Sequence, residues 1–139
     1  MNELIEKIKE EGDKHFWEYK GFKCLMRRNV LKCWCGYVKI PIDTPLDFDF
    51  ESGDYLPINC HGGVTYQELE GDDWVVGFDC GHSGDLIPFQ FGTELLNNSL
   101  NNVYRDKEYV VNEVNNIVEQ LLKMKPLRRS LRIDEILGN

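Results

Sequence analysis

Hydrophobic and polar residues follow two different periods along this chain, and the change between them predicts where a helix gives way to strands. Within residues 2–11, aliphatic residues recur at helical spacing between charged pairs, which predicts a short amphipathic helix ended by Gly12. From Phe16 onward, hydrophobic and polar residues alternate, which is the period of a half-buried strand.

The segments with the shorter period predict three strands. Residues 16–19 and 22–26 flank Lys20-Gly21, a pattern typical of a hairpin. The polar triplet 27–29 predicts the next turn, and residues 31–40 predict a third strand rich in aromatic and β-branched residues.

Residues 41–57 combine three prolines and a glycine with acidic and aromatic residues, which predicts a surface loop of the length of a lid. Its acidic part resembles a calcium-binding loop. However, Ser52 stands where the turn glycine belongs, and Ile58 stands where the bidentate glutamate belongs. A solvated acidic loop is therefore the better interpretation.

Strand character returns at Ile58. Segments 64–66 and 74–78 flank the acidic turn 68–73 and predict a second hairpin. In segment 74–78 the large hydrophobic residues occupy alternate positions and share one face, so Asp79 should point to the opposite face.

The C-terminal part predicts a long helix over residues 106–124, capped by Asp106 and packed on the sheet. Its apolar stripe consists of Val110, Val114, Ile117, Val118, Leu121 and Leu122. Residues 125–139 are expected to form a tail or a short helix. The whole chain, 1–139, is thus expected to be a single α+β domain: mainly an antiparallel sheet, with its core in residues 16–124.

The composition of the chain indicates the cellular compartment in which we expect the protein. No run approaches the roughly 18–20 apolar residues of a membrane span. Residues 1–7 alternate in charge and lack the apolar stretch of a secretory signal. We therefore expect a cytoplasmic protein with no membrane partner. The cysteines are then buried thiols, ligands or nucleophiles rather than disulfides. They are Cys24, Cys33, Cys35, Cys60 and Cys80.

The net charge of −8 is unevenly distributed. Residues 40–104 contain twelve acidic residues and no Lys or Arg, so the remainder carries +4, since −8 minus −12 equals +4. A duplex-binding protein concentrates Lys and Arg on one surface. The sequence therefore predicts no nucleic acid duplex as a partner.

Two motifs carry the candidate chemistry. Adjacent glycines in His61-Gly62-Gly63 permit close approach of a ligand or of another backbone, with a β-bulge as the structural alternative. Segment 79–85 interleaves ionisable side chains with glycine directly after an apolar strand, where sites are commonly built. An ordinary Asp/Ser/Gly turn is its structural alternative. We expect His61 and His82 to lie within one pocket.

Three chemistries fit these residues. The first is a zinc site using Cys60, Cys80 and His82, although no C-x-x-C pair is present. The second is a Cys80 nucleophile with a histidine base. The third uses His61 and His82 as acid and base on a phosphodiester, with a cation beside the phosphate. The cations that flank the acidic stretch are Arg27, Arg28, Lys39 and Arg105. We predict that the protein uses no cofactor, and the alternative is a bound zinc ion.

Four blocks of sequence resemble a family of small phage and bacterial proteins. They are residues 35–41, His61-Gly62-Gly63-Val64-Thr65-Tyr66, the run from Trp74 to Asp85, and residues 104–110. The resemblance covers residues 19–122. It departs from the family pattern at Val75, Gly81 and Ser83. It implies a phage or host-cytoplasm context rather than a chemistry. By analogy with phage anti-defence proteins, it suggests that the ligand is a nucleotide immune signal.

The leading hypothesis is a viral protein that sequesters a small polar ligand, most simply a nucleotide-derived signal. The predicted ligand-binding residues are His61, Gly62, Gly63, Thr65, Asp79, His82, Ser83, Asp85 and Arg105. Trp34, Tyr66 or Trp74 would stack a base. Two alternatives remain: a hydrolase, and an acidic protein-interaction module that mimics nucleic acid. The catalytic residues of the hydrolase would be His61, His82, Asp79 and Asp85. A homo-oligomer is compatible with each.

Overall fold

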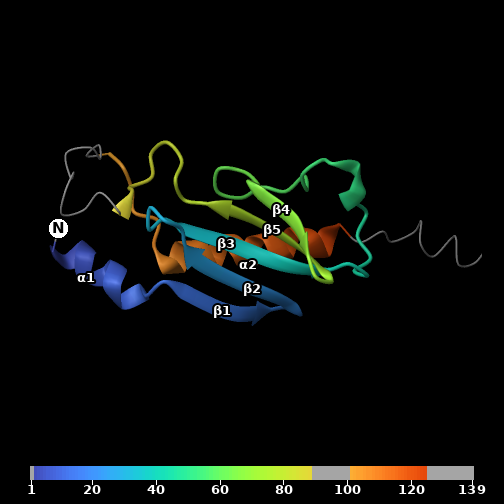
Figure 1. Cartoon of the computed structure of the whole chain (residues 1–139), viewed down its shortest axis with the longest axis horizontal. Helices are drawn as coiled ribbons and strands as arrows, with labels where there is room; N and C mark the ends of the chain where they lie inside the picture. Colours follow the sequence, from blue (N-terminus) through green and yellow to red (C-terminus); the bar gives the residue numbers. More distant parts are fainter. Residues whose placement is uncertain (1, 89–100, 125–139) are drawn as a thin grey trace, which may run out of the picture.

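The computed structural model describes residues 2–88 and 101–124, and it places one long helix across one face of an antiparallel sheet (Figure 1). The strand order is β1-β2-β3-β5-β4, and each neighbouring pair is antiparallel. The predicted α+β class is confirmed. The elements are α1 (Asn2–Glu11), β1 (Lys14–Tyr19), β2 (Phe22–Arg28), β3 (Trp34–Pro41), η1 (Phe50–Ser52), β4 (Tyr66–Glu70), β5 (Asp73–Asp79) and α2 (Lys107–Lys123).

The first hairpin forms as predicted, with Tyr19 opposite Phe22 around the turn. The predicted turn at residues 27–29 is wrong, because Arg27 and Arg28 continue β2. The turn lies at residues 29–33 instead. There Asn29 Oδ1 accepts hydrogen bonds from two backbone N–H groups of the turn, which a solvent-facing asparagine provides locally.

Residues 41–57 do not form a free lid. Phe50, in the 3-10 helix η1, stacks on Trp74 with ring centroids 5.0 Å apart, and Leu56 is buried. The aromatic residues of this acidic segment therefore extend the core beyond the sheet. In the second hairpin only Gly71-Asp72 lies between the strands, so Glu68 and Glu70 belong to β4 rather than to the turn.

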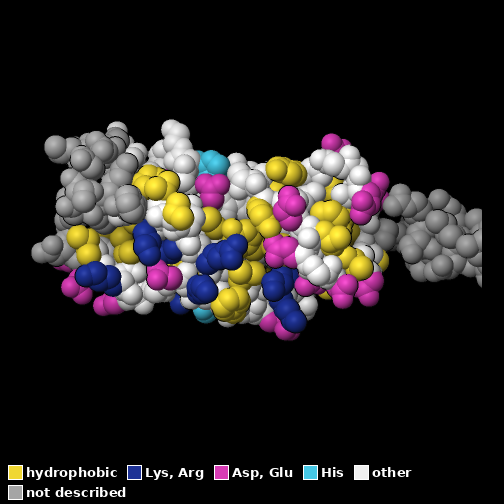
Figure 2. Space-filling model, viewed as in Figure 1, with side chains coloured by type: hydrophobic (Ala, Val, Ile, Leu, Met, Phe, Trp, Pro, Cys, Tyr) yellow, Lys and Arg dark blue, Asp and Glu magenta, His cyan; other side chains and the backbone are white. Residues whose placement is uncertain are grey.

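Alternation along the strands creates two faces. The inner face packs against α2 and holds Trp17, Cys24, Met26, Trp34, Val38, Ile40, Val76 and Phe78. We call the opposite side the open face; it holds Lys14, Phe16, Glu18, Lys23, Leu25, Arg27, Tyr37, Lys39, Tyr66, Glu68, Val75 and Asp79. Asp79 thus points away from the core, as predicted. Figure 2 views this face, with Lys and Arg side chains among hydrophobic ones over β1–β3.

Helix α2 follows its predicted pattern closely. Asp106 is the N-cap, and its side chain accepts from the backbone N–H of Tyr109 at 2.9 Å. Five of the six stripe residues are fully buried, and Leu122 packs at their edge. A Cβ on Gly36 would lie 2.6 Å from Val114 Cγ2, so the glycine allows the helix to approach β3 closely. Neither described helix is long and apolar enough to cross a bilayer.

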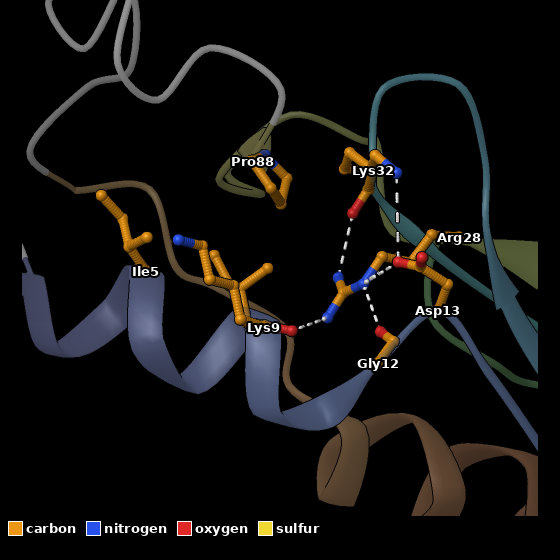
Figure 3. A pocket seen from close by; sticks show the side chains of 8 residues that line it. Ile5, Lys9, Gly12, Asp13, Arg28, Lys32 and Pro88 are labelled. Atoms are coloured by element: carbon orange, nitrogen blue, oxygen red, sulfur yellow. Dashed lines mark hydrogen bonds and ion pairs between the residues drawn. The ribbon is translucent and has the colours of Figure 1, made fainter.

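Arg28 anchors α1 to the sheet (Figure 3). Its buried guanidinium donates to the carbonyls of Ile8, Gly12 and Lys32 and lies 4.0 Å from the ring centroid of Trp34. It also pairs with Glu11 at 3.3 Å. Carbonyls at the end of a helix have no partner within the helix, so Arg28 caps α1 from the side.

We predict that Val114→Asp destabilises the fold by about 3–5 kcal/mol, because it places an unpaired charge in the core. Chemical denaturation at neutral pH measures the change. Asn112→Asp introduces the same charge at an exposed position of α2 and should change stability by less than about 0.5 kcal/mol. Equal midpoints for the two variants would contradict the packing assigned to α2.

Candidate functional site

Polar side chains from three segments converge beside the end of β5. We call this set the polar cluster: His61, Thr65, Asp79, His82, Asp85, Arg105 and Tyr109. They come from the loop before β4, the turn after β5, and the start of α2. Segments far apart in sequence therefore supply one site.

The loop that carries His61 is not a strand, which corrects the expectation for residues 58–64. Asn59 docks it on α2: its backbone N–H donates to Gln120 Oε1, and its carbonyl accepts from Gln120 Nε2. Gly62 and Gly63 then turn the chain with φ angles of 69° and 84°, so they form a tight turn rather than a β-bulge.

Asp85 lies at the centre of the polar cluster, with its side chain 1% exposed. His61 Nε2 lies 2.7 Å from Oδ2, Arg105 Nε donates to Oδ1 at 2.9 Å, and the backbone N–H of His82 donates to Oδ2 at 3.0 Å. Burial acts to raise the pKa of Asp85. The hydrogen bonds from His61, Arg105 and His82 together outweigh it and lower the pKa below its usual value.

His61 is engaged at both ring nitrogens. An ionised carboxylate only accepts hydrogen bonds, so Nε2 carries a proton directed at Asp85. The other nitrogen, Nδ1, lies 2.7 Å from the hydroxyl of Tyr109. Asp85, His61 and Tyr109 thus form a chain of carboxylate, imidazole and phenol in which a proton can pass from the hydroxyl to the ring.

His82 lies beside His61, with ring centroids 5.8 Å apart, so the two histidines come together in space; the predicted shared pocket stays a prediction. Its Nε2 is buried and has no hydrogen-bond partner in the described chain. Asp79 Oδ1 is 3.4 Å away, within range of an ion pair but without the geometry of a hydrogen bond. Gly62 covers the ring: a Cβ there would lie 2.2 Å from it, so only glycine fits.

The remaining predicted residues of segment 79–85 differ in their involvement. Asp79 accepts from Thr65 Oγ1 at 3.1 Å and from the backbone N–H of Gly81 at 2.9 Å. Asp85 N–H donates to the carbonyl of His82 and closes the turn. Ser83 is exposed on that turn and forms no hydrogen bond with the polar cluster.

Arg105 joins the polar cluster rather than pairing with Glu108 on the helix surface. Its Nε binds Asp85, and its guanidinium carbon lies 5.0 Å from the ring centroid of Tyr109. Its two Nη groups have no partner among residues 2–88 and 101–124, and the side chain is 28% exposed. Because Nε satisfies a buried carboxylate, removing Arg105 should lower stability as well as any affinity.

The cysteines do not provide a nucleophile here. Cys80 is buried, and the loss of hydration raises the pKa of its thiol far above the usual range, the opposite of an activated thiolate. Burial likewise raises the pKa of Cys60 to about 11. Within the described chain, no group of three or more His, Cys, Asp or Glu side chains is arranged to hold a metal ion.

Two of the three aromatic residues expected to stack a base are unavailable. Trp34 is buried and donates its indole N–H to Glu11, and Trp74 is covered by Phe50. Tyr66 lies on the open face, where its ring meets the ring of Tyr37 edge-on at 5.5 Å.

Tyr109 is the functional residue that sequence reasoning missed. It stands next to the apolar stripe of α2, so the sequence alone favours a ring that packs in the core. Its position could have indicated a role in the site. Tyr109 lies three residues after the N-cap Asp106, and side chains of a helix tilt toward its N-terminus, which directs the Tyr109 side chain toward the loops at the start of α2.

Comparison with models of protein families, with curated proteins and with solved structures finds no match for this chain. The polar cluster therefore has to be interpreted from its own geometry.

We predict that Asp85→Asn lowers the free energy of unfolding by about 2–4 kcal/mol at neutral pH, because Arg105 and His61 lose their charged acceptor. Since folding lowers the pKa of Asp85, its contribution is complete above the usual value of about 4 and is lost as pH falls through the folded pKa.

Urea denaturation between about pH 7 and pH 2 tests this pH dependence. The Asp85→Asn protein should lose less stability over the acidic part of that range than the wild type. Asp43→Asn, at an exposed position, is the control and should follow the wild-type curve. A wild-type slope retained in Asp85→Asn would show that other groups produce the acid sensitivity.

Proposed function

We propose that this protein binds and sequesters a small anionic ligand, nucleotide-derived in its simplest form, at one edge of the polar cluster. Gly62, His82 and Arg105 form that edge. The observation that carries the proposal is the buried Nε2 of His82, which has no hydrogen-bond partner among residues 2–88 and 101–124. Native proteins satisfy nearly all such atoms, and an unsatisfied one costs about 1–3 kcal/mol. A ligand oxygen would satisfy it on binding, with Gly62, which covers the ring, shifting aside to admit it.

The positive charge at this edge of the polar cluster favours an anionic ligand. Within the described part of the chain, both Nη groups of Arg105 are available for a ligand, while Nε binds Asp85 and fixes the direction of the guanidinium. A fixed guanidinium recognises phosphate through parallel hydrogen bonds. The start of α2, directly after Arg105, adds favourable potential for negative charge.

The resemblance to phage and bacterial proteins supports a biological setting for this activity. A phage protein that holds a nucleotide immune signal in the host cytoplasm would act by stoichiometric binding and would need no cofactor. A nucleotide supplies the phosphate for Arg105 and His82, and it also supplies polar hydroxyl or amino groups for the neighbouring carboxylate of Asp79.

A hydrolase is the second candidate, and one observation favours it. The hydroxyl of Tyr109, His61 and Asp85 are joined by two contacts of 2.7 Å, the order in which a carboxylate orients an imidazole that accepts a proton from a hydroxyl. Because both nitrogens of His61 are engaged, acid–base chemistry would reach a phosphodiester through Tyr109 rather than from His61 directly.

The binding proposal is tested with His82→Gln. Calorimetric titration of the wild type with nucleoside monophosphates, cyclic mononucleotides and cyclic dinucleotides should find a ligand, and His82→Gln should weaken it at least about tenfold. His15→Gln is the matched control, because His15 stacks on Trp17 away from the polar cluster. Equal losses for both variants, or no binding by the wild type, would refute the proposal. An acidic protein-interaction module would give the latter result.

Tyr109→Phe separates binding from turnover. It removes only the hydroxyl that contacts His61, so a sequestering protein should retain its ligand within about fivefold and a hydrolase should lose activity. Mass spectrometry of the ligand after heat denaturation provides the measurement. Intact nucleotide recovered from the wild type supports sequestration, whereas fragments that disappear in Tyr109→Phe support hydrolysis.

A further inference from the structure

The open face carries a row of ring and aliphatic side chains that runs across the sheet. The strand register places Phe16 opposite Leu25 and Leu25 opposite Tyr37, and Gly77 lies between Tyr37 and Tyr66. A Cβ on Gly77 would lie 2.4 Å from the ring of Tyr37, so the glycine lets that ring lie against the sheet. Phe16 is 64% exposed, which is unusual for a phenylalanine in a strand.

Four cations flank this row: Lys14, Lys23, Arg27 and Lys39. None of them forms an ion pair within the described chain. The register sets Lys14 directly opposite Arg27 and Lys23 directly opposite Lys39. Like charges in direct cross-strand pairs destabilise a sheet. Glu18 on β1 lies directly opposite Lys23 and offsets part of that repulsion, whereas the row of Lys14 and Arg27 continues to Cys35 and contains no acid on β1–β3, so an anion over this pair would stabilise it.

A hollow of about 230 Å³ lies within this face, lined by Lys14, Phe16, Leu25, Arg27, Tyr37, Lys39, Glu70 and Val75. Arg27 lies 5.4 Å above the ring centroid of Tyr37 at its floor. The one acid of the lining, Glu70, accepts a hydrogen bond from the hydroxyl of Tyr66. Glu68 lies on the same β4 side, and Glu18 lies on β1 at the other edge, so acidic side chains border the basic surface at both edges of the sheet.

We propose that the open face binds single-stranded nucleic acid over β1–β3, with phosphates on Lys14, Arg27 and Lys39 and a base on Phe16. A single strand presents both a chain of phosphates and unpaired bases, which matches cations interleaved with exposed rings. A duplex hides its base faces and would leave Phe16 without a role. The net charge of −8 weakens long-range attraction, so binding depends on these local contacts.

Fluorescence anisotropy with labelled oligothymidylate and oligouridylate of about twelve nucleotides tests the proposal and distinguishes DNA from RNA. The wild type should bind at about 50 mM salt and weaken as salt rises. The double variant Arg27→Gln with Lys39→Gln should weaken binding. It should also reduce the slope of log affinity against log salt by about 1.4, the value for two phosphate contacts on a single strand. Phe16→Ala should lower affinity about tenfold.

Matched controls remove the same charge or ring elsewhere. Lys9→Gln with Lys123→Gln changes the net charge equally, and Tyr55→Ala removes another exposed ring; both should bind as the wild type does. Amide NMR of the wild type should place the oligonucleotide-induced shifts on β1–β3 rather than on α2, a result that needs no variant to fold.

Three outcomes would overturn the proposal. They are no binding at low salt, equal losses in the test and control variants, and a dimer in sedimentation that Phe16→Ala dissociates while no oligonucleotide binds. The last outcome would assign the open face to a second copy of the chain.

Discussion

The buried carboxylate of Asp85 is the constraint on which the polar cluster depends. A charge with its side chain 1% exposed is tolerated only when hydrogen bonds replace its hydration, and Asp85 receives them from His61, Arg105 and the backbone of His82. These donors come from three separate segments. Satisfying one carboxylate therefore fixes the loop before β4, the turn after β5 and the start of α2 relative to one another. The proton relay to Tyr109 and the position of His82 are consequences of that single requirement.

A second buried charge holds the other side of the α2 N-terminus. Glu11, at the end of α1, accepts from Arg28, from Tyr104 and from the backbone N–H of Lys107, the first residue of α2. The first N–H groups of a helix lack partners within the helix, so this carboxylate acts as an additional cap from α1. Helix α2 thus begins between two buried carboxylates, while its apolar stripe fixes its rotation on the sheet. Polar contacts set where the helix starts, and packing sets which face it presents.

The sequence predicted the parts of the fold that depend on local pattern. The stripe of α2, its Asp106 cap, the first hairpin and the outward direction of Asp79 follow from spacing alone. Prediction failed where partners come from distant segments. Arg28 is polar and was placed in a turn, but its partners lie in α1, at Lys32 and at Tyr104, which no local pattern reveals. Residues 58–64 look like a strand because apolar Ile58 and Cys60 alternate with polar Asn59 and His61, yet docking on Gln120 replaces strand pairing. The meeting of His61 and His82 was predictable, but the engagement of both nitrogens of His61 was not.

The polar cluster and the open face meet at Asp79, and this junction explains how an acidic chain keeps a basic surface. Asp79 lies in register with Cys35, which in turn lies opposite Arg27, so it is the acid of β5 nearest to the cations of β2. Its two oxygens are occupied by Thr65 and by the backbone of Gly81. Since these local donors hold the carboxylate at the end of β5, Asp79 forms no ion pair with Arg27, whose guanidinium stays available to an anion from outside the chain. Acidic side chains on this face are otherwise confined to its borders, such as Glu68 and Glu70 on β4. On the open face Glu18 thus lies on the edge strand β1, and Glu68 and Glu70 lie on the edge strand β4, while the charged side chains of β2 and β3 between them are all cations.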